Sequence, residues 1–242
     1  MSGIGVVLAA GGKGLRMGGP VPKQFLEIEG EPIYRKALAP FLASPDVAVV
    51  LVGMPALYVD EVRMDLARRF PESVESGRLD VFAGGVRRQD TVERGVRRLF
   101  DLFPAITGAL VHDAARPFLS ASVLAETIRT LREGKAVGVG VPVVDTLWKT
   151  HEEREGGIRI AEIVSRDRMV TAQTPQGGPR ELFLRALDLA RLEDREFTDE
   201  ASLFLRAGIP FYLVEGSGKN RKITRPEDLA LETSRERGNK SN

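Results

Sequence analysis

The chain contains no cysteine and only two histidines among its 242 residues, and these absences exclude several kinds of chemistry. Disulfides, thiolate nucleophiles and thiolate metal sites all need cysteine, and the composition fits a reducing compartment. A histidine-rich zinc site is excluded as well, and a Ser-His-Asp triad would have to use His112 or His151. We interpret His112 as a core histidine bonded to the backbone.

The chain also lacks an excess of charge of either sign and a long hydrophobic run. Its 35 lysines and arginines are balanced by 34 acidic residues, which leaves a net charge of +1. We therefore expect neither nucleic acid nor an anionic membrane as a partner. The apolar start, residues 4–10, is far shorter than a membrane span and has no basic segment before it. These features predict a cytoplasmic protein.

Internal repeats, low-complexity tracts and Pro/Ser-rich linkers are absent too, so nothing in the sequence marks a second domain. With 43% hydrophobic residues the chain can bury a sizeable core. We predict a single domain over residues 1–236, which includes a β-arm at about 145–164, and a disordered tail over residues 237–242.

Short β-branched runs alternate with amphipathic stretches through the first half of the chain, which is typical of a parallel sheet covered on both faces. Val92, Val96 and Leu99, for example, recur at helical spacing. The pattern predicts strands at 47–52, 79–83, 109–112 and 136–144, and helices at 32–42, 56–70, 88–103 and 120–133. We therefore predict an α/β fold with a doubly wound, mostly parallel sheet.

The alternation stops after Val144. The next segment, to about residue 164, carries two strand-like stretches around the turn EREGG and has no helical period. We interpret it as a two-stranded β-arm that leaves the domain, and because such a hairpin is marginal alone, we expect it to pair with the arm of a second subunit. Beyond it, helices are predicted at 179–191, 199–207 and from 226 onward, and extended segments at 211–214 and 222–224.

Residues 6–23 read VVLAAGGKGLRMGGPVPK, an apolar run that meets a glycine cluster and then two cations, Arg16 and Lys23. A buried strand that leads into a glycine-rich turn presents backbone N–H groups to an anion, and the cations add countercharge. The turn fails the dinucleotide pattern because Gly18 comes one residue too late, and it fails the P-loop pattern because its Gly-Lys pair precedes another glycine. A purely connecting turn has no use for two nearby cations, so the segment predicts a polyphosphate-binding loop.

Together with six further blocks, this loop resembles the 2-C-methyl-D-erythritol 4-phosphate cytidylyltransferase family of the non-mevalonate isoprenoid pathway. The blocks are PKQF, AGGVRRQDTV, VHDAARP, SRDRMVTAQTPQ, TDEAS and NRKITRPEDLAL, in the family's order and reaching about residue 231. The family transfers CMP from CTP to methylerythritol phosphate and releases pyrophosphate. The resemblance therefore implies a Rossmann-like nucleotidyltransferase that uses Mg²⁺ and acts as a homodimer.

The implied reaction needs cations more than it needs a base. The attacking oxygen belongs to a phosphate monoester, whose second pKa lies near 6, so it is already an anion at neutral pH. Attack on the α-phosphorus of CTP requires charge neutralisation and in-line positioning. By resemblance Arg16 and Lys23 stabilise the pentacoordinate transition state, and Arg166 and Lys222 complete the catalytic set.

The resemblance also assigns the binding residues. The nucleotide-binding positions are Leu8, Ala9, Ala10, Gly11, Gly12, Gly85, Arg88, Thr91, Asp113, Ala114 and Ala115. The acceptor-binding positions are Asp113, Arg116, Thr146, Arg166, Thr174 and Lys222. Asp113 is also the candidate for a direct Mg²⁺ contact, with the metal held mainly by CTP phosphates. If the arm is exchanged between subunits, Thr146 and Arg166 serve the neighbour's site.

The chain departs from the family pattern at several positions. The glycine loop is one residue longer than AAG-x-G-x-R-M, Val86 stands where an acidic residue is common, Leu8 replaces a frequent proline, and GlyGly follows TPQ where an aromatic residue is common. These departures affect the sugar contacts and leave the proposed cations intact. Two alternatives remain: a related ribitol phosphate cytidylyltransferase, which differs in the acceptor pocket, and a nucleotide-binding regulator without turnover.

Overall fold

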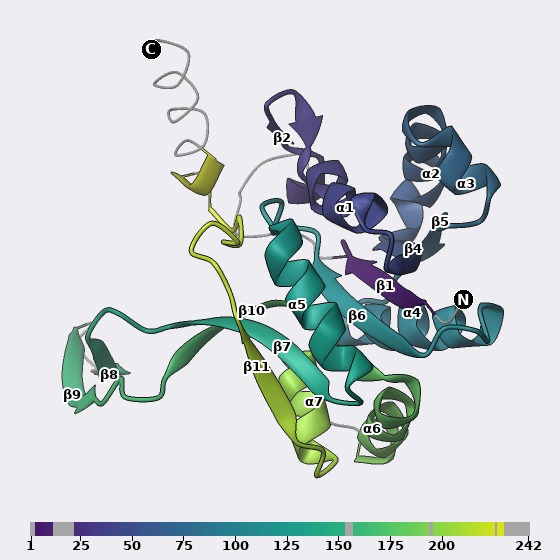
Figure 1. The fold of residues 1–242 in the computed structure, drawn as a ribbon. Coiled ribbons are helices and arrows are strands. Elements are labelled where there is room, and N and C mark those ends of the chain that lie inside the picture. Colours follow the sequence, from purple (N-terminus) through teal and green to yellow (C-terminus); the bar gives the residue numbers. More distant parts are fainter. Residues whose placement is uncertain (1–2, 12–21, 153–156, 194–195, 226, 230–242) are drawn as a thin grey trace.

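The fold is built around a seven-stranded sheet with the strand order β11-β7-β10-β6-β1-β4-β5 (Figure 1). The structure is a computed structural model that describes residues 3–11, 22–152, 157–193, 196–225 and 227–229. The strands are β1 (Ile4–Ala9), β4 (Val47–Met54), β5 (Leu79–Ala83), β6 (Gly108–Asp113), β7 (Ala136–Pro142), β10 (Val170–Pro179) and β11 (Phe211–Glu215). Only β10 runs antiparallel to its neighbours in this sheet, so the predicted mostly parallel sheet is confirmed.

Both faces of the sheet are buried, because successive apolar residues of the central strands point into opposite cores. In β4, Val50 and Val52 face one core, whereas Val49 and Leu51 face the other. The first core is covered by α1 (Ile33–Ala43), α2 (Val59–Arg69) and α5 (Ala121–Arg132), and the second by α4 (Arg88–Leu102), α6 (Arg180–Glu193) and α7 (Glu200–Arg206). The doubly wound α/β architecture is therefore confirmed.

Short elements connect these layers. They are η2 (Lys23–Phe25), β2 (Glu27–Ile28), β3 (Glu31–Pro32), η3 (Ala56–Tyr58) and α3 (Pro71–Glu75). The helix predicted at 56–70 is divided between η3 and α2. The helix predicted at 120–133 is α5, where the Ser120 side chain caps the N-terminus and Gly134, at a φ of +82°, follows the C-terminus.

Strand β10 was not predicted from the sequence. Its sequence, VTAQTPQGGP, contains prolines and glycines that normally argue against a central strand. The proline after Thr174 lies where the register with β7 shifts, between Gln173 and Gln176. A Cβ on Gly177 would come within 1.9 Å of the Ala109 carbonyl oxygen of β6. The residues that obscure the strand pattern are therefore the ones that fit β10 between β6 and β7.

The predicted arm is confirmed as an antiparallel pair, β8 (Leu147–Glu152) and β9 (Ile158–Val164), which projects from the rest of the fold (Figure 1). The strand before the arm ends at Pro142, earlier than predicted. Residues 222–224, which were predicted to be extended, are not assigned to a strand. The predicted tail at 237–242 lies outside the described residues, and the extent of the single domain stays a prediction. Among the helices described, none is long and apolar enough to cross a bilayer.

Candidate active site

The carboxyl ends of four parallel strands form one edge of the sheet, the place where open α/β folds bind ligands. Strands β1 and β6 end level with each other, since Ala9 pairs with Asp113 and the Ala114 N–H donates to the Ala9 carbonyl at 3.1 Å. The turn after β5 joins β4, because the Gly84 N–H donates to the Met54 carbonyl at 2.7 Å. The loops after β1, β4, β5 and β6 are thereby gathered at this edge.

Asp113, the last residue of β6, is the centre of a charge cluster at this edge. Its Oδ1 accepts a hydrogen bond from Nε of Arg88 at 2.9 Å, and its Oδ2 accepts one from Nζ of Lys222 at 2.6 Å. Burial opposes ionisation of this carboxyl, but Arg88 and Lys222 outweigh burial and hold its pKa below the ordinary value. Asp113 is therefore an anion held between two cations.

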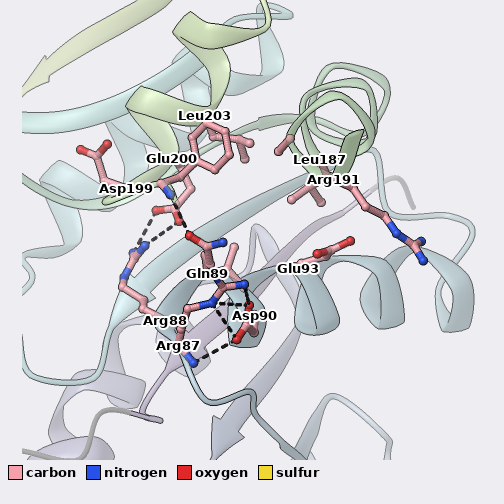
Figure 2. Close-up of a pocket in the computed structure, with 13 residues that line it drawn as sticks. Arg87, Arg88, Gln89, Asp90, Glu93, Leu187, Arg191, Asp199, Glu200 and Leu203 are labelled. Atoms are coloured by element: carbon pink, nitrogen blue, oxygen red, sulfur yellow. Dashed lines mark hydrogen bonds and ion pairs between the residues drawn. The ribbon is translucent and has the colours of Figure 1, made fainter. Parts of the chain in front are cut away.

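Arg88, the first residue of α4, is shared between Asp113 and a second carboxylate, Glu200 of α7. Its Nη1 and Nη2 donate to Oε1 and Oε2 of Glu200 at 2.8 and 3.0 Å (Figure 2). The Glu200 side chain is only 3% exposed, and burial raises its pKa. Both residues line a cavity of about 140 Å³ between α4, α6 and α7. The bidentate contact with Glu200 fixes the plane of the Arg88 guanidinium.

A second cluster forms where the glycine turns meet α4. The buried Thr91 hydroxyl oxygen accepts a hydrogen bond from the Gly85 N–H at 2.9 Å. A Cβ on Gly11 would come within 3.0 Å of that oxygen, and a Cβ on Gly85 would come within 2.2 Å of the Asp90 Cβ. Close packing against α4 therefore favours glycine at both positions.

His112 is fully buried, and both of its ring nitrogens are used inside the fold. Nε2 lies 3.0 Å from the Arg116 carbonyl oxygen, and Nδ1 lies 2.9 Å from the Thr174 hydroxyl. Because a carbonyl only accepts, Nε2 carries the proton and Nδ1 accepts from Thr174. The Thr174 oxygen in turn accepts from the Asp113 N–H at 3.1 Å. Burial lowers the pKa of His112 to about 4, so the predicted core histidine is confirmed and is neutral at pH 7.

Arg116 holds the C-terminal segment against this edge. Its Nη1 donates to the Asn220 carbonyl at 2.8 Å, and its Nη2 donates to a carbonyl of β10 at 3.2 Å. The buried Asn220 amide donates to the Thr174 carbonyl at 2.8 Å, and the Ile223 N–H donates to the loop after β6 at 2.8 Å. Lys222 lies between these two anchored residues, which places its ammonium group beside Asp113.

Comparison with known proteins identifies the family to which this chain belongs. The family model described as 2-C-methyl-D-erythritol 4-phosphate cytidylyltransferase matches residues 4–234, which is nearly the whole chain. The chain belongs to this family.

Individual relatives agree with this membership. The cytidylyltransferase of that name from Solibacter usitatus is 36% identical over 235 residues, which cover 94% of this chain and 93% of that protein. The "Bifunctional enzyme IspD/IspF" of Solidesulfovibrio magneticus is 39% identical over 93% of this chain, and this chain spans 55% of its length. The crystal structure of 2-C-methyl-D-erythritol 4-phosphate cytidylyltransferase from Thermus thermophilus matches with a TM-score of 0.74 at 31% identity, covering 98% of this chain and 100% of that one.

The structure brings most of the positions expected of a cytidylyltransferase to the same edge of the sheet. The ion-paired residues are Arg88, Asp113 and Lys222; the bonded neighbours are Gly85, Thr91, Arg116 and Thr174; and the strand ends are Leu8, Ala9, Ala10, Gly11, Ala114 and Ala115. Lys23 begins η2 and is half-buried. Their roles toward substrates stay predictions.

The remaining positions lie elsewhere or outside the described residues. Thr146 is exposed just before β8. Arg166 follows β9, and its Nη1 donates to the Val144 carbonyl. Within the described ranges neither is hydrogen-bonded to the Asp113 cluster. Gly12 and Arg16 are not among the residues that the structure describes.

Sequence reasoning missed Glu200 and Asn220, although both lie in blocks that carried the family resemblance. Glu200 stands at helical spacing from Leu203 and Phe204 on the buried face of α7, so an acidic residue on an apolar face was the available signal. Asn220 gave no such signal, because its buried contacts are with β10, the strand that the sequence pattern did not reveal.

Proposed function

We propose that this chain transfers CMP from CTP to 2-C-methyl-D-erythritol 4-phosphate, giving CDP-methylerythritol and pyrophosphate. The observation that carries the proposal is the Asp113 cluster, in which Arg88 and Lys222 meet at the carboxyl edge of the sheet. All three residues belong to blocks of the family to which the chain belongs. A ribitol phosphate acceptor and a regulator without turnover are not favoured by this membership.

The acceptor phosphate supplies its own nucleophile. It is largely a dianion at neutral pH, and one of its oxygens attacks the α-phosphorus of CTP in line with the departing pyrophosphate. The new P–O bond forms as the bond to the β-phosphate oxygen breaks, and no proton has to move. This chemistry fits a site whose buried histidine has both nitrogens occupied within the fold.

Lysine and arginine side chains balance the charge of the two substrates. Lys222 uses one of its three N–H donors on Asp113, which leaves two for the acceptor phosphate. Arg16 and Lys23 are assigned to the α-phosphate by their motif positions, where neutralising either would cost about 10² to 10³ in turnover. The backbone of the turns around Gly11 and Gly85 would receive the nucleotide.

Mg²⁺ is the cation that we assign to this reaction. The Asp113 carboxylate offers hard oxygen ligands of the kind that Mg²⁺ prefers, and each oxygen keeps a lone pair beyond its bond to Arg88 or Lys222. In the part of the chain that the structure describes, no group of three or more acidic or histidine side chains is placed to hold a metal. This donor set fits an ion held mainly by CTP phosphates, where it would shield their charge.

The active form that we propose is a homodimer joined through the β8–β9 arm. Trp148 and Ile163 stand opposite each other in the arm, and they are 60% and 71% exposed. A two-stranded hairpin with such an apolar surface needs a covering partner, and a second copy of the arm supplies one.

We also propose a cytoplasmic location, because a chain without cysteine fits a reducing compartment.

The acceptor assay tests the reaction. Pyrophosphate release from CTP and Mg²⁺ should be faster by orders of magnitude with methylerythritol phosphate than with ribitol phosphate, and Lys222→Ala should raise the acceptor KM about tenfold or more. CTP affinity, measured by calorimetry, should change little. The exposed Lys219, three residues earlier, provides the matched control as Lys219→Ala. A preference for ribitol phosphate, or CTP binding without turnover, would contradict the proposed function.

A further inference from the structure

Glu200 is not among the residues assigned to a substrate, but it binds Arg88, which is assigned to the nucleotide. It accepts hydrogen bonds from both Nη atoms of Arg88, and the Nε of the same guanidinium donates to Asp113. We infer that Glu200 is a positioning residue for CTP binding, which acts by fixing the Arg88 guanidinium against Asp113. The inference rests on the proposed nucleotide site.

The donor geometry explains why this arrangement matters. A guanidinium that faces a single carboxylate tends to bind both of its oxygens through two parallel N–H bonds. With Nη1 and Nη2 held by Glu200, Arg88 contacts Oδ1 of Asp113 through Nε, and Oδ2 accepts from Lys222. Without Glu200, the Arg88 guanidinium can rotate to bind both oxygens of Asp113, in competition with Lys222.

Charge and burial support the same inference. Glu200, Arg88, Asp113 and Lys222 form a row in which anions and cations alternate, from the interior of α7 to the sheet edge (Figure 2 shows the Glu200 end). Glu200 is almost fully buried, and a buried carboxylate is costly unless it is paired. A purely structural clamp between α4 and α7 would use the same ion pair, so the experiment has to separate stability from CTP binding.

A double-mutant cycle makes this separation. Glu200→Gln, Arg88→Gln and the double variant are compared by the CTP dissociation constant, measured by calorimetry with Mg²⁺ and no acceptor, and by Tm. Glu200→Gln should weaken CTP binding about tenfold, the scale of one charged hydrogen bond, and Arg88→Gln at least as much. The double variant should melt above Arg88→Gln, because no buried charge is left unpaired, yet it should bind CTP no better.

The control is Glu193→Gln, which removes a half-buried carboxylate that pairs α6 with Arg206 of α7. Its CTP affinity should match the parent chain. Glu200→Gln within twofold of the parent, or a double variant that regains CTP affinity together with Tm, would overturn the inference, as would a parent chain that fails to bind CTP. A parent chain that binds CTP and forms no CDP-methylerythritol would instead contradict the proposed function, while the cycle still decides the role of Glu200.

Discussion

His112 ties the stability of the fold to pH at the scale of a single side chain. Burial lowers its pKa to about 4 from an ordinary 6.5, with the nearby charges of Asp113, Arg116 and Arg88 in opposing directions. Between these values the unfolded chain binds a proton that the folded chain does not. The contribution is therefore complete above about pH 6.5 and is lost as the pH falls toward 4, a change of about 3 kcal/mol in the free energy of unfolding.

Replacing this histidine should remove that part of the pH dependence. His112→Gln should lower stability at pH 7.5, because the bonds to Thr174 and Arg116 are disturbed, and it should flatten the fall in stability between pH 6.5 and 4. Urea unfolding across this range measures the slope. The exposed His151 of β8 is the chain's other histidine, and His151→Gln should keep the parent slope. An unchanged slope in His112→Gln would contradict this assignment.

Motif position and local pattern were sufficient to predict some of these residues. Asp113 and Lys222 were expected at the site, and His112 was expected in the core, because each follows from its block or from the strand before it. The partners of these residues were not predictable. Glu200 meets Arg88 across 112 positions, and an ion pair over such a separation depends on tertiary packing that a single sequence does not display.

At the scale of the elements, the arm carries its own prediction. Trp148→Lys places a charge on the exposed apolar surface of β8 and should convert the proposed dimer to monomers without loss of the main sheet. Sedimentation velocity measures the change, and circular dichroism checks the fold. The matched control is Leu192→Lys on α6, where an 85% exposed leucine lies away from the arm. A Trp148→Lys variant that sediments like the parent dimer, or a parent chain that is already monomeric, would exclude an arm-linked dimer.

Helices and strands were predicted correctly where the sequence has a recognisable apolar pattern. Strand β10 was missed because tertiary contacts determine its residues. Strand β5 at Leu79–Ala83 and helix α4 at Arg88–Leu102 follow the predicted ranges closely, because one is a short, mostly apolar run and the other has a clear apolar face. Strand β10 lacks such a run. Its Gly177 is set by the close approach of the Ala109 carbonyl, which is a property of the neighbouring strand.

The whole molecule should act as a dimer whose sites combine both chains, if Arg166 reaches the partner's site through the arm. Arg166→Ala and Lys23→Ala should each abolish most activity alone. In heterodimers one site then receives both defects and the other receives none, so random mixing should recover about a quarter of the parent activity. Steady-state turnover of co-refolded mixtures measures this recovery. Mixtures no more active than the single variants would show that each chain completes its own site.

The fold class could be predicted from the sequence because burial on both faces of the sheet makes the central parallel strands almost entirely apolar. The dimer joined through the arm stays a prediction. The order of the seven strands could not be predicted from the sequence, since β10 lies between β6 and β7 although β8 and β9 precede it in the chain.

The late position of Lys222 has a consequence for synthesis of the enzyme. Lys222 completes the Asp113 cluster from 109 positions further along the chain, after the last strand has ended at Glu215. During translation every strand of the main sheet therefore leaves the ribosome before the residue that closes the site. The nascent chain can pair these strands before the Asp113–Lys222 ion pair forms, so we expect the acceptor site proposed above to be completed after the sheet.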